Sequence, residues 1–334
     1  MNAAIKVGGH AAVHAIVMRT ERPGITVTST DLGRTTSIRT TAELRLPFDP
    51  TRWASLACAA IALNTESDDP PRSINEVCRT MWDGPGGLHV TTYSTLPKGS
   101  GLGTSSILGA TLLAALADAS GRTMTVERLF AQTLRLEQML GTGGGWQDQA
   151  GGLTPGVKLL TTSPGFDQVP RVSTLSDRLF SERNGPRMLL YFTGERRMAR
   201  GILRGVVGRY LARDPRMLRA LVALKSGANA MADAVKAGDN SEIAARLAEY
   251  WSLKRAADPG ASLPSVESIT HKLRDELLAW ELPGAGGGGY LFMIARDADA
   301  EHRIRLYLRK NPLNVESRFA DVEIDVRGLA VRRT

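Results

Sequence analysis

Three glycine-dense segments constrain the fold of this chain most, because each lies where one predicted element gives way to the next. They are LPKGSGLGTSSILG (residues 96–109), GTGGGWQDQAGGLTPG (141–156) and LPGAGGGGYLFMIA (282–295). Glycine has no Cβ and adopts conformations closed to other residues, so such segments allow a backbone to approach a ligand or another backbone closely. The pattern predicts a site made of loops on a scaffold of strands and helices.

Length and composition indicate an ordinary globular protein. The chain has 334 residues, 43% of them hydrophobic and 23% charged, which suits one large domain or two smaller ones. Cys58 and Cys78 lack metal-ligand spacing and are too few for a disulfide framework. The run ASLACAAIAL is too short to cross a bilayer, and the first residues resemble a strand and not a signal peptide. We expect a cytoplasmic protein with no membrane segment.

The net charge of +8 raises the question of polyanionic partners. A nucleic-acid-binding protein would interleave aromatic residues with its basic ones, yet aromatics are only 5% of the chain, and acids and bases alternate over residues 295–327. The pattern disfavours nucleic acid and favours a basic surface around an anionic small molecule. RNA binding is kept as an alternative, which salt-sensitive retention on RNA would support.

The order of predicted elements is strand-rich first and mixed afterwards, which implies an α+β architecture. Alternation predicts strands over 3–7, 12–20, 24–31, 35–40 and 86–96, and helical spacing predicts helices over 49–64, 104–119 and 125–140. We expect the second half to contain a strand at 187–193, a helix at 196–213, further helices through Trp280, a strand at 290–295, a helix at 302–310 and strands at 319–326 and 328–333. A boundary in SERNGP (181–186) divides the chain into domains 1–183 and 184–334.

The first glycine segment has the parts of an anion site. A helix N-terminus has unpaired N–H groups and a partial positive charge, and hydroxyls at 104, 105 and 106 follow the glycines. The segment is not a P-loop, because Gly103 and not Lys precedes Thr104, and it is not a dinucleotide fingerprint, because position 104 is Thr. A phosphate cradle of another type and an ordinary turn with a helix cap both remain open.

Two carboxylates accompany the second segment. Glu137 is expected near the C-terminal end of its helix, where the dipole disfavours a carboxylate that has no cation beside it, and Asp148 lies among glycines. Two carboxylates and a hydroxyl near an anion cradle are the parts that phosphoryl transfer needs. The third segment precedes a strand, so we expect it to pack against a ligand or against the first segment.

These motifs together resemble a known family. LPKGSGLGTSS resembles the second motif of the GHMP kinases (the galactokinase, homoserine kinase, mevalonate kinase and phosphomevalonate kinase superfamily), and LPGAGGGGYLFMIARD resembles the third. GGGWQDQAGGLTPGVKL and YFTGERRMARGIL are similar to the fucokinase branch, and the likeness covers essentially the whole chain. The resemblance implies two domains with ATP between them: an N-terminal mixed or antiparallel sheet with helices, and a C-terminal ferredoxin-like α+β domain.

The resemblance also implies roles for individual residues. Asp148 would be the catalytic base, Arg197 a charge partner for phosphate or sugar, and Ser105 and Glu137 the ligands of Mg²⁺. Gly286 and Gly287 would belong to the floor of the site. The residues expected to hold the ATP phosphates are Lys98, Gly99, Ser100, Gly101, Leu102, Gly103, Thr104, Ser105 and Ser106.

The implied activity is transfer of phosphate from ATP to the anomeric hydroxyl of a sugar, with L-fucose as the expected acceptor and a functional link to a sugar nucleotidyltransferase. Alternatives are a D-glycero-D-manno-heptose 7-phosphate kinase and a nucleotide-binding remnant without turnover. The chain departs from the pattern at its start, where relatives have a further strand and a Gly-Gly-Trp loop that helps to hold the sugar. Without that strand we expect an exposed sheet edge that favours self-association.

Overall fold

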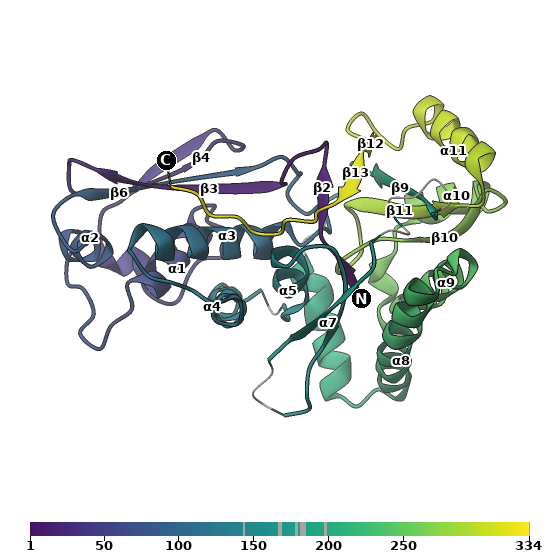
Figure 1. The fold of residues 1–334 in the computed structure, drawn as a ribbon, viewed down its shortest axis with the longest axis horizontal. Coiled ribbons are helices and arrows are strands. Elements are labelled where there is room, and N and C mark those ends of the chain that lie inside the picture. Colours follow the sequence, from purple (N-terminus) through teal and green to yellow (C-terminus); the bar gives the residue numbers. More distant parts are fainter. Residues whose placement is uncertain (143, 166–168, 178–179, 181–184, 197–198, 334) are drawn as a thin grey trace.

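The structure is a computed structural model that describes residues 1–142, 144–165, 169–177, 180, 185–196 and 199–333. It has the predicted α+β architecture in two domains (Figure 1). The predicted boundary between residues 183 and 184 lies outside the described residues. The strands are β1 (Asn2–Ala3), β2 (Ile5–Val7), β3 (Val13–Thr20), β4 (Ile25–Ser29), β5 (Arg34–Ile38), β6 (Gly87–Ser94), β7 (Val157–Thr161), β8 (Arg171–Leu175), β9 (Arg187–Phe192), β10 (Leu277–Glu281), β11 (Tyr290–Ala295), β12 (Arg318–Ala320) and β13 (Val322–Ile324).

The helices account for the rest of the regular structure. They are α1 (Ser55–Asn64), α2 (Ile74–Trp82), α3 (Thr104–Ala119), α4 (Val126–Met139), α5 (Gln147–Leu153), α7 (Ala199–Leu211), α8 (Pro215–Ala237), α9 (Asn240–Ala257), α10 (Pro264–Lys272) and α11 (Ala298–Lys310), with short 3-10 turns at Thr41–Leu44 and Pro259–Ala261. In the described residues no helix is both long and apolar enough to cross a membrane.

The N-terminal domain is a mixed sheet covered by helices. Its strand order is β3-β6-β4-β5, with β4 parallel to β6 and the other neighbours antiparallel. Helices α1, α3 and α4 lie on one side of this sheet (Figure 1). The core between these layers includes buried side chains from strands and helices alike, such as Ile25, Val90, Ile61 and Leu116. This packing fixes the N-terminal end of α3 at the edge that faces the second domain.

The C-terminal domain is an antiparallel sheet, β10-β11-β9-β12, with α8 and α9 packed together as a helical pair beside it. The prediction that helices continue through Trp280 is wrong, because Leu277–Glu281 form strand β10. Pairing with β11 decides this, since Trp280 lies opposite Met293 and Ala279 opposite Ile294. A short apolar run gives no helical period of its own, so its strand partner determines its structure.

Segments from the two ends of the chain join the domains. β2 pairs with β13, and β1 pairs with β7, so the start of the chain bridges strands from both halves. The last residues return across the N-terminal domain, where Leu329 donates its N–H to the Leu153 carbonyl at 3.1 Å (Figure 1). The prediction of a strand over 328–333 is wrong, because these residues form an extended strap with no strand pairing described.

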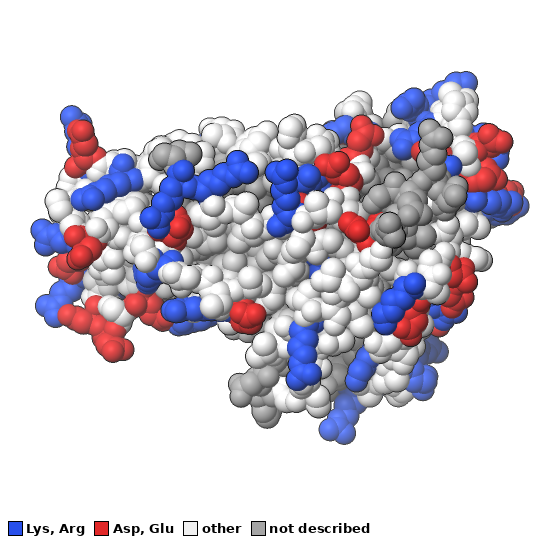
Figure 2. All heavy atoms as spheres, in the orientation of Figure 1, with Lys and Arg blue, Asp and Glu red and all other residues white. Residues whose placement is uncertain are grey.

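Charge on the molecular surface is mixed. Figure 2 shows basic and acidic side chains interspersed over both domains of this face. Many of them form surface ion pairs, for example Arg333 with Asp118 at 3.0 Å and Arg303 with Glu276 at 2.7 Å. Exposed pairs of this kind contribute little to stability, so the interior packing holds the domains together.

Candidate active site

The first glycine segment turns directly into α3. Gly99, Gly101 and Gly103 all have left-handed backbone conformations, with φ of 77°, 78° and 66°. The first backbone hydrogen bond of α3 is donated by the Ile107 N–H to the Gly103 carbonyl at 3.0 Å. The N–H groups of residues 104–106 have no acceptor in the described part of the chain. These free donors and the helix dipole make the start of α3 suited to an anion.

Polar side chains brace this loop from inside. Ser100 is almost fully buried, and its hydroxyl lies 2.8 Å from the Thr104 hydroxyl and accepts a hydrogen bond from the Leu102 N–H at 3.3 Å. Lys98 and Ser105 are exposed, so both point away from this internal network. The loop is therefore preorganised without a ligand, and its outer face remains available for contacts with one.

The third glycine segment packs against the first. This is one of the two arrangements expected from the sequence, the other being packing against a ligand. A Cβ on Gly101 would lie 2.9 Å from the Pro283 carbonyl oxygen, and one on Gly289 would lie 2.2 Å from the Ser100 oxygen. Tyr290 donates its N–H to that same Ser100 oxygen at 2.9 Å. Gly287 is held by a bond from its N–H to the Ala261 carbonyl at 2.6 Å, and Gly286 lies in the same turn. Only glycine fits so close a contact between two backbones.

Glu137 lies at the C-terminal end of α4 and is buried. Its carboxylate accepts a hydrogen bond from the Ser106 hydroxyl, which is also buried. Ser105, which is expected to share Mg²⁺ with Glu137, is exposed one position earlier on α3, and no direct hydrogen bond between the two is found in the described residues. Burial raises the pKa of Glu137 to about 7, with a smaller increase from the negative charge of Asp148.

Asp148 lies in the first turn of α5, where the helix dipole favours a carboxylate. Its side chain packs on Gly103, since a Cβ there would lie 2.9 Å from both the Cβ and the Cγ of Asp148. Lys158 fixes the other end of α5, because its buried ammonium donates to the carbonyls of Gly151, at 2.7 Å, and Thr154. Burial raises the pKa of Asp148, and the positive charge of Lys254 opposes that increase.

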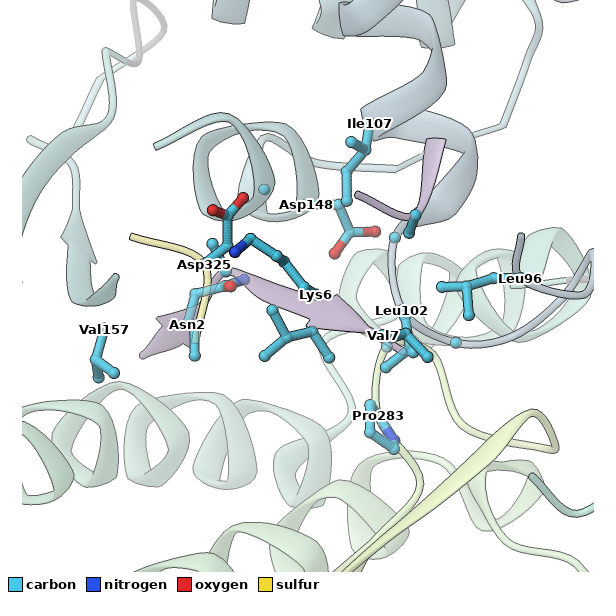
Figure 3. Close-up of a pocket in the computed structure, with 18 of the residues that line it drawn as sticks. Asn2, Lys6, Val7, Leu96, Leu102, Ile107, Asp148, Val157, Pro283 and Asp325 are labelled. Carbon is cyan, nitrogen blue, oxygen red and sulfur yellow. The ribbon is translucent and has the colours of Figure 1, made fainter. Parts of the chain in front are cut away.

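A large cavity of about 1690 Å³ is lined by Asp148 together with Gly101, Leu102 and Gly103, whereas Glu137 and Ser106 are not among its lining residues. Figure 3 shows the Asp148 carboxylate projecting into it, with Leu102 of the first glycine segment and Pro283 of the third on its wall. Residues 99–106 of the first segment are called the phosphate loop below. The C-terminal domain contributes Tyr250 and Glu281. Neither residue was predicted from the sequence, because the residue pattern of α9 and β10 does not distinguish a site residue from a core residue.

The donor set suits Mg²⁺ bound together with phosphate. Within the described ranges, no cluster of three or more His, Cys, Asp or Glu side chains could hold a metal ion alone. Mg²⁺ is usually held by one or two carboxylates and by substrate phosphates, and it prefers oxygen ligands. Glu137 and the neighbouring hydroxyl of Ser106 or Ser105 meet that requirement beside the anion-binding end of α3. Arg197, the expected charge partner, lies outside the described residues.

Comparison with known families identifies the family of this chain. The family model for the GHMP kinases N terminal domain matches residues 72–156, and the model for the GHMP kinases C terminal domain matches residues 231–313. The chain belongs to the GHMP kinases. The N-terminal match contains the phosphate loop, Glu137 and Asp148, and the C-terminal match contains the third glycine segment.

Individual GHMP relatives add detail. The chain is 37% identical to "L-fucokinase/L-fucose-1-P guanylyltransferase" of Bacteroides fragilis, over 100% of this chain and 35% of that protein. It is 33% identical to "Bifunctional fucokinase/GDP-fucose pyrophosphorylase" of Arabidopsis thaliana, over 93% of this chain and 28% of that protein. The chain therefore spans about a third of the length of these relatives.

Two further similarities are weaker. The chain is 27% identical to "D-glycero-alpha-D-manno-heptose 7-phosphate kinase" of Campylobacter jejuni, over 71% of this chain and 69% of that protein. The solved structure of Streptococcus pneumoniae phosphomevalonate kinase, in complex with phosphomevalonate and AMPPNP, superimposes with a TM-score of 0.67 at 15% identity, covering 92% of this chain and 89% of that one. This likeness concerns the GHMP kinase fold alone.

Proposed function

We propose that this GHMP kinase transfers the γ-phosphoryl group of ATP to the anomeric hydroxyl of L-fucose, giving fucose 1-phosphate and ADP. The observation that carries the proposal is the contact of Asp148 with Gly103, which places a carboxylate beside the anion-binding end of α3 in one cavity. A proton acceptor and a phosphate cradle side by side are what transfer to a hydroxyl requires.

Each group has a defined task in this reaction. The free N–H groups of residues 104–106 would bind phosphate oxygens and stabilise the charge that develops during transfer. Asp148 would accept or steer the proton of the sugar hydroxyl, a mild demand because a hemiacetal hydroxyl is more acidic than an ordinary alcohol. Glu137 with Ser105 or Ser106 would hold Mg²⁺, which neutralises phosphate charge when bound.

The choice of sugar rests on the relatives. Both bifunctional proteins named above include fucokinase in their names, and the similarity extends over nearly the whole of this chain. Their names also include a guanylyltransferase or pyrophosphorylase activity. We therefore propose that the product is passed to a sugar nucleotidyltransferase, and that both steps take place in the cytoplasm.

The test is an ADP-release assay with L-fucose, D-mannose and heptose 7-phosphate. We expect turnover with L-fucose, and a decrease in kcat of about 100-fold for Asp148→Asn, within the range for loss of a general base. Asp299→Asn is the matched control, because Asp299 also lies in the first turn of a helix but is exposed on α11. An Asp148→Asn enzyme as fast as the parent would remove Asp148 from its assigned role.

A heptose 7-phosphate kinase is the second candidate. A substrate that has its own phosphate needs extra positive charge, and Arg327 lines the cavity together with Lys6 and Arg246, which already pair with acidic side chains. The Campylobacter jejuni relative also has this activity in its name. Turnover of heptose 7-phosphate but not of L-fucose would favour this candidate, and nucleotide binding by calorimetry without any turnover would favour a binding protein.

A further inference from the structure

Lys254 is a buried cation that the proposed reaction has not yet used. It lies on α9, and its ammonium donates to the Leu282 carbonyl and lies 3.6 Å from a carboxylate oxygen of Glu281. The rings of Tyr250 and Trp251 lie 5.4 and 5.6 Å from the same ammonium. Burying a lysine is costly, and burial here lowers its pKa. Its surroundings therefore have to compensate for that cost.

The hydrogen bond to Leu282 reaches the first residue of the third glycine segment. The next residue, Pro283, has its carbonyl against Gly101, and Gly284 lies against the Gly101 carbonyl. Lys254 thus anchors the start of a segment whose position depends on direct contact with the phosphate loop. A displacement of Leu282 would also displace Gly101, because the backbones of Pro283 and Gly284 are in close contact with Gly101.

Lys254 also acts across the boundary between the domains. Its charge opposes the effect of burial on Asp148, which belongs to the N-terminal domain. The other titratable groups in this region are Glu137 on α4 and Tyr250 on α9, which both respond to the charge of Asp148, and Glu281 on β10, which lies beside Lys254 and acts on Tyr250 and the Met1 amine. Two of these are carboxylates, so a nearby cation is needed if Asp148 is to stay ionised beside ATP.

We propose that Lys254 is a positioning residue for phosphoryl transfer, which holds the third glycine segment against the phosphate loop and places a positive charge beside Tyr250 and Glu281, which line the same cavity as Asp148. The role rests on the kinase function proposed above. If Lys254 served only as a structural partner of Glu281, removing both charges together would restore activity. A positioning role predicts that activity stays low even then. The two roles predict different outcomes when both charges are removed.

The experiment compares Lys254→Met, Lys254→Arg and the double variant Lys254→Met/Glu281→Gln. Lys254→Met removes the ion-pair partner of the buried Glu281 and leaves the Met1 amine as the other positive charge near it, so the melting temperature of this variant should decrease. The double variant should recover much of that loss. We expect kcat to stay at least tenfold low in the double variant, with little change in the KM for ATP, and to recover partly in Lys254→Arg. Arg255→Met is the matched control, because this neighbouring cation pairs with Glu267 instead.

A second readout does not need turnover. Carbon-13 labelling of aspartate carboxyls, with Asp148→Asn for assignment, gives the titration midpoint of Asp148 in the nucleotide-free protein. We expect the midpoint to rise in Lys254→Met and to remain above the parent value in the double variant. An unchanged midpoint in both variants, or wild-type kcat in the double variant, would overturn the proposal. If the parent enzyme phosphorylates no sugar, the proposed function fails and the midpoint alone decides the charge role.

Discussion

At the scale of single residues, Glu137 is expected to lower the stability of the protein at neutral pH while contributing to the proposed activity. Its pKa is raised to about 7, so the folded protein binds more protons than the unfolded chain between about pH 4.5 and 7. Stability must therefore fall as pH rises through that window. We expect Glu137→Gln to abolish this loss, with a gain of up to about 3 kcal/mol at pH 8 and little gain at pH 4.5, while activity decreases at least 100-fold.

Thermal unfolding at pH 4.5 and 8, in buffer without Mg²⁺, measures this effect. Glu127→Gln is the control, because Glu127 lies in the first turn of the same helix and is exposed. A Glu137→Gln variant that is less stable than the parent at pH 8 would show that the carboxylate is stabilised in its ionised form.

The limits of prediction at this scale are geometric. The sequence could identify Glu137 and Asp148, because a carboxylate at a helix end and one among glycines both stand out. It could not choose among three consecutive hydroxyls, since each step along a helix rotates the side chain by about 100° and only the packed structure shows that Ser106 meets Glu137. Lys254 gave no signal, because its importance depends on a strand and a loop distant in sequence.

At the scale of elements, the contact between α5 and the phosphate loop makes Gly103 indispensable. Gly103→Ala must place a Cβ within 2.9 Å of Asp148, in addition to straining a left-handed backbone. We expect a kcat at least tenfold lower, because the base and the start of α3 are pushed apart. Gly121→Ala is a matched comparison, since Gly121 has φ of 70° but no atom near its Cβ position.

Both alanine variants should lose about 1 kcal/mol from backbone strain, measured by chemical denaturation. Only Gly103→Ala should also lose activity in the ADP-release assay. Equal activity in the two variants would mean that Asp148 can move away from the new Cβ at position 103 without loss of function.

Elements with their own boundary signals were predicted correctly. The sequence predicts α3 over Thr104–Ala119, because glycines precede it and Ser120-Gly121 ends it, and it predicts Thr125 as the cap of α4, where the hydroxyl accepts from the Arg128 N–H. Helix α5 was missed because two glycines lie within its seven residues. Tertiary contacts with α3 and the cap by Lys158 form it in spite of its low propensity.

At the scale of the whole molecule, the two domains should unfold together. Strand pairs from opposite ends of the chain and the strap over the N-terminal domain tie them to each other. Leu329 in the strap packs against the N-terminal core, so Leu329→Ala should cost about 2 kcal/mol and lower the melting temperature of one shared transition.

Differential scanning calorimetry tests this, with Val331→Ala as the control because Val331 is half-exposed. A calorimetric enthalpy close to the van't Hoff enthalpy is expected. Two resolved peaks in the parent protein would show that the strap and the shared strands do not couple the domains.

The contact between Ser100 and the Gly289–Tyr290 backbone also limits how the enzyme can move. A hinged kinase closes by swinging one domain toward the other, but here the backbones at the centre of the cleft are already joined by a hydrogen bond and by contact that excludes even a methyl group. The pivot of any motion therefore lies at the phosphate loop itself. The substrates of the proposed reaction would therefore enter through the open side of the cavity without displacing this contact.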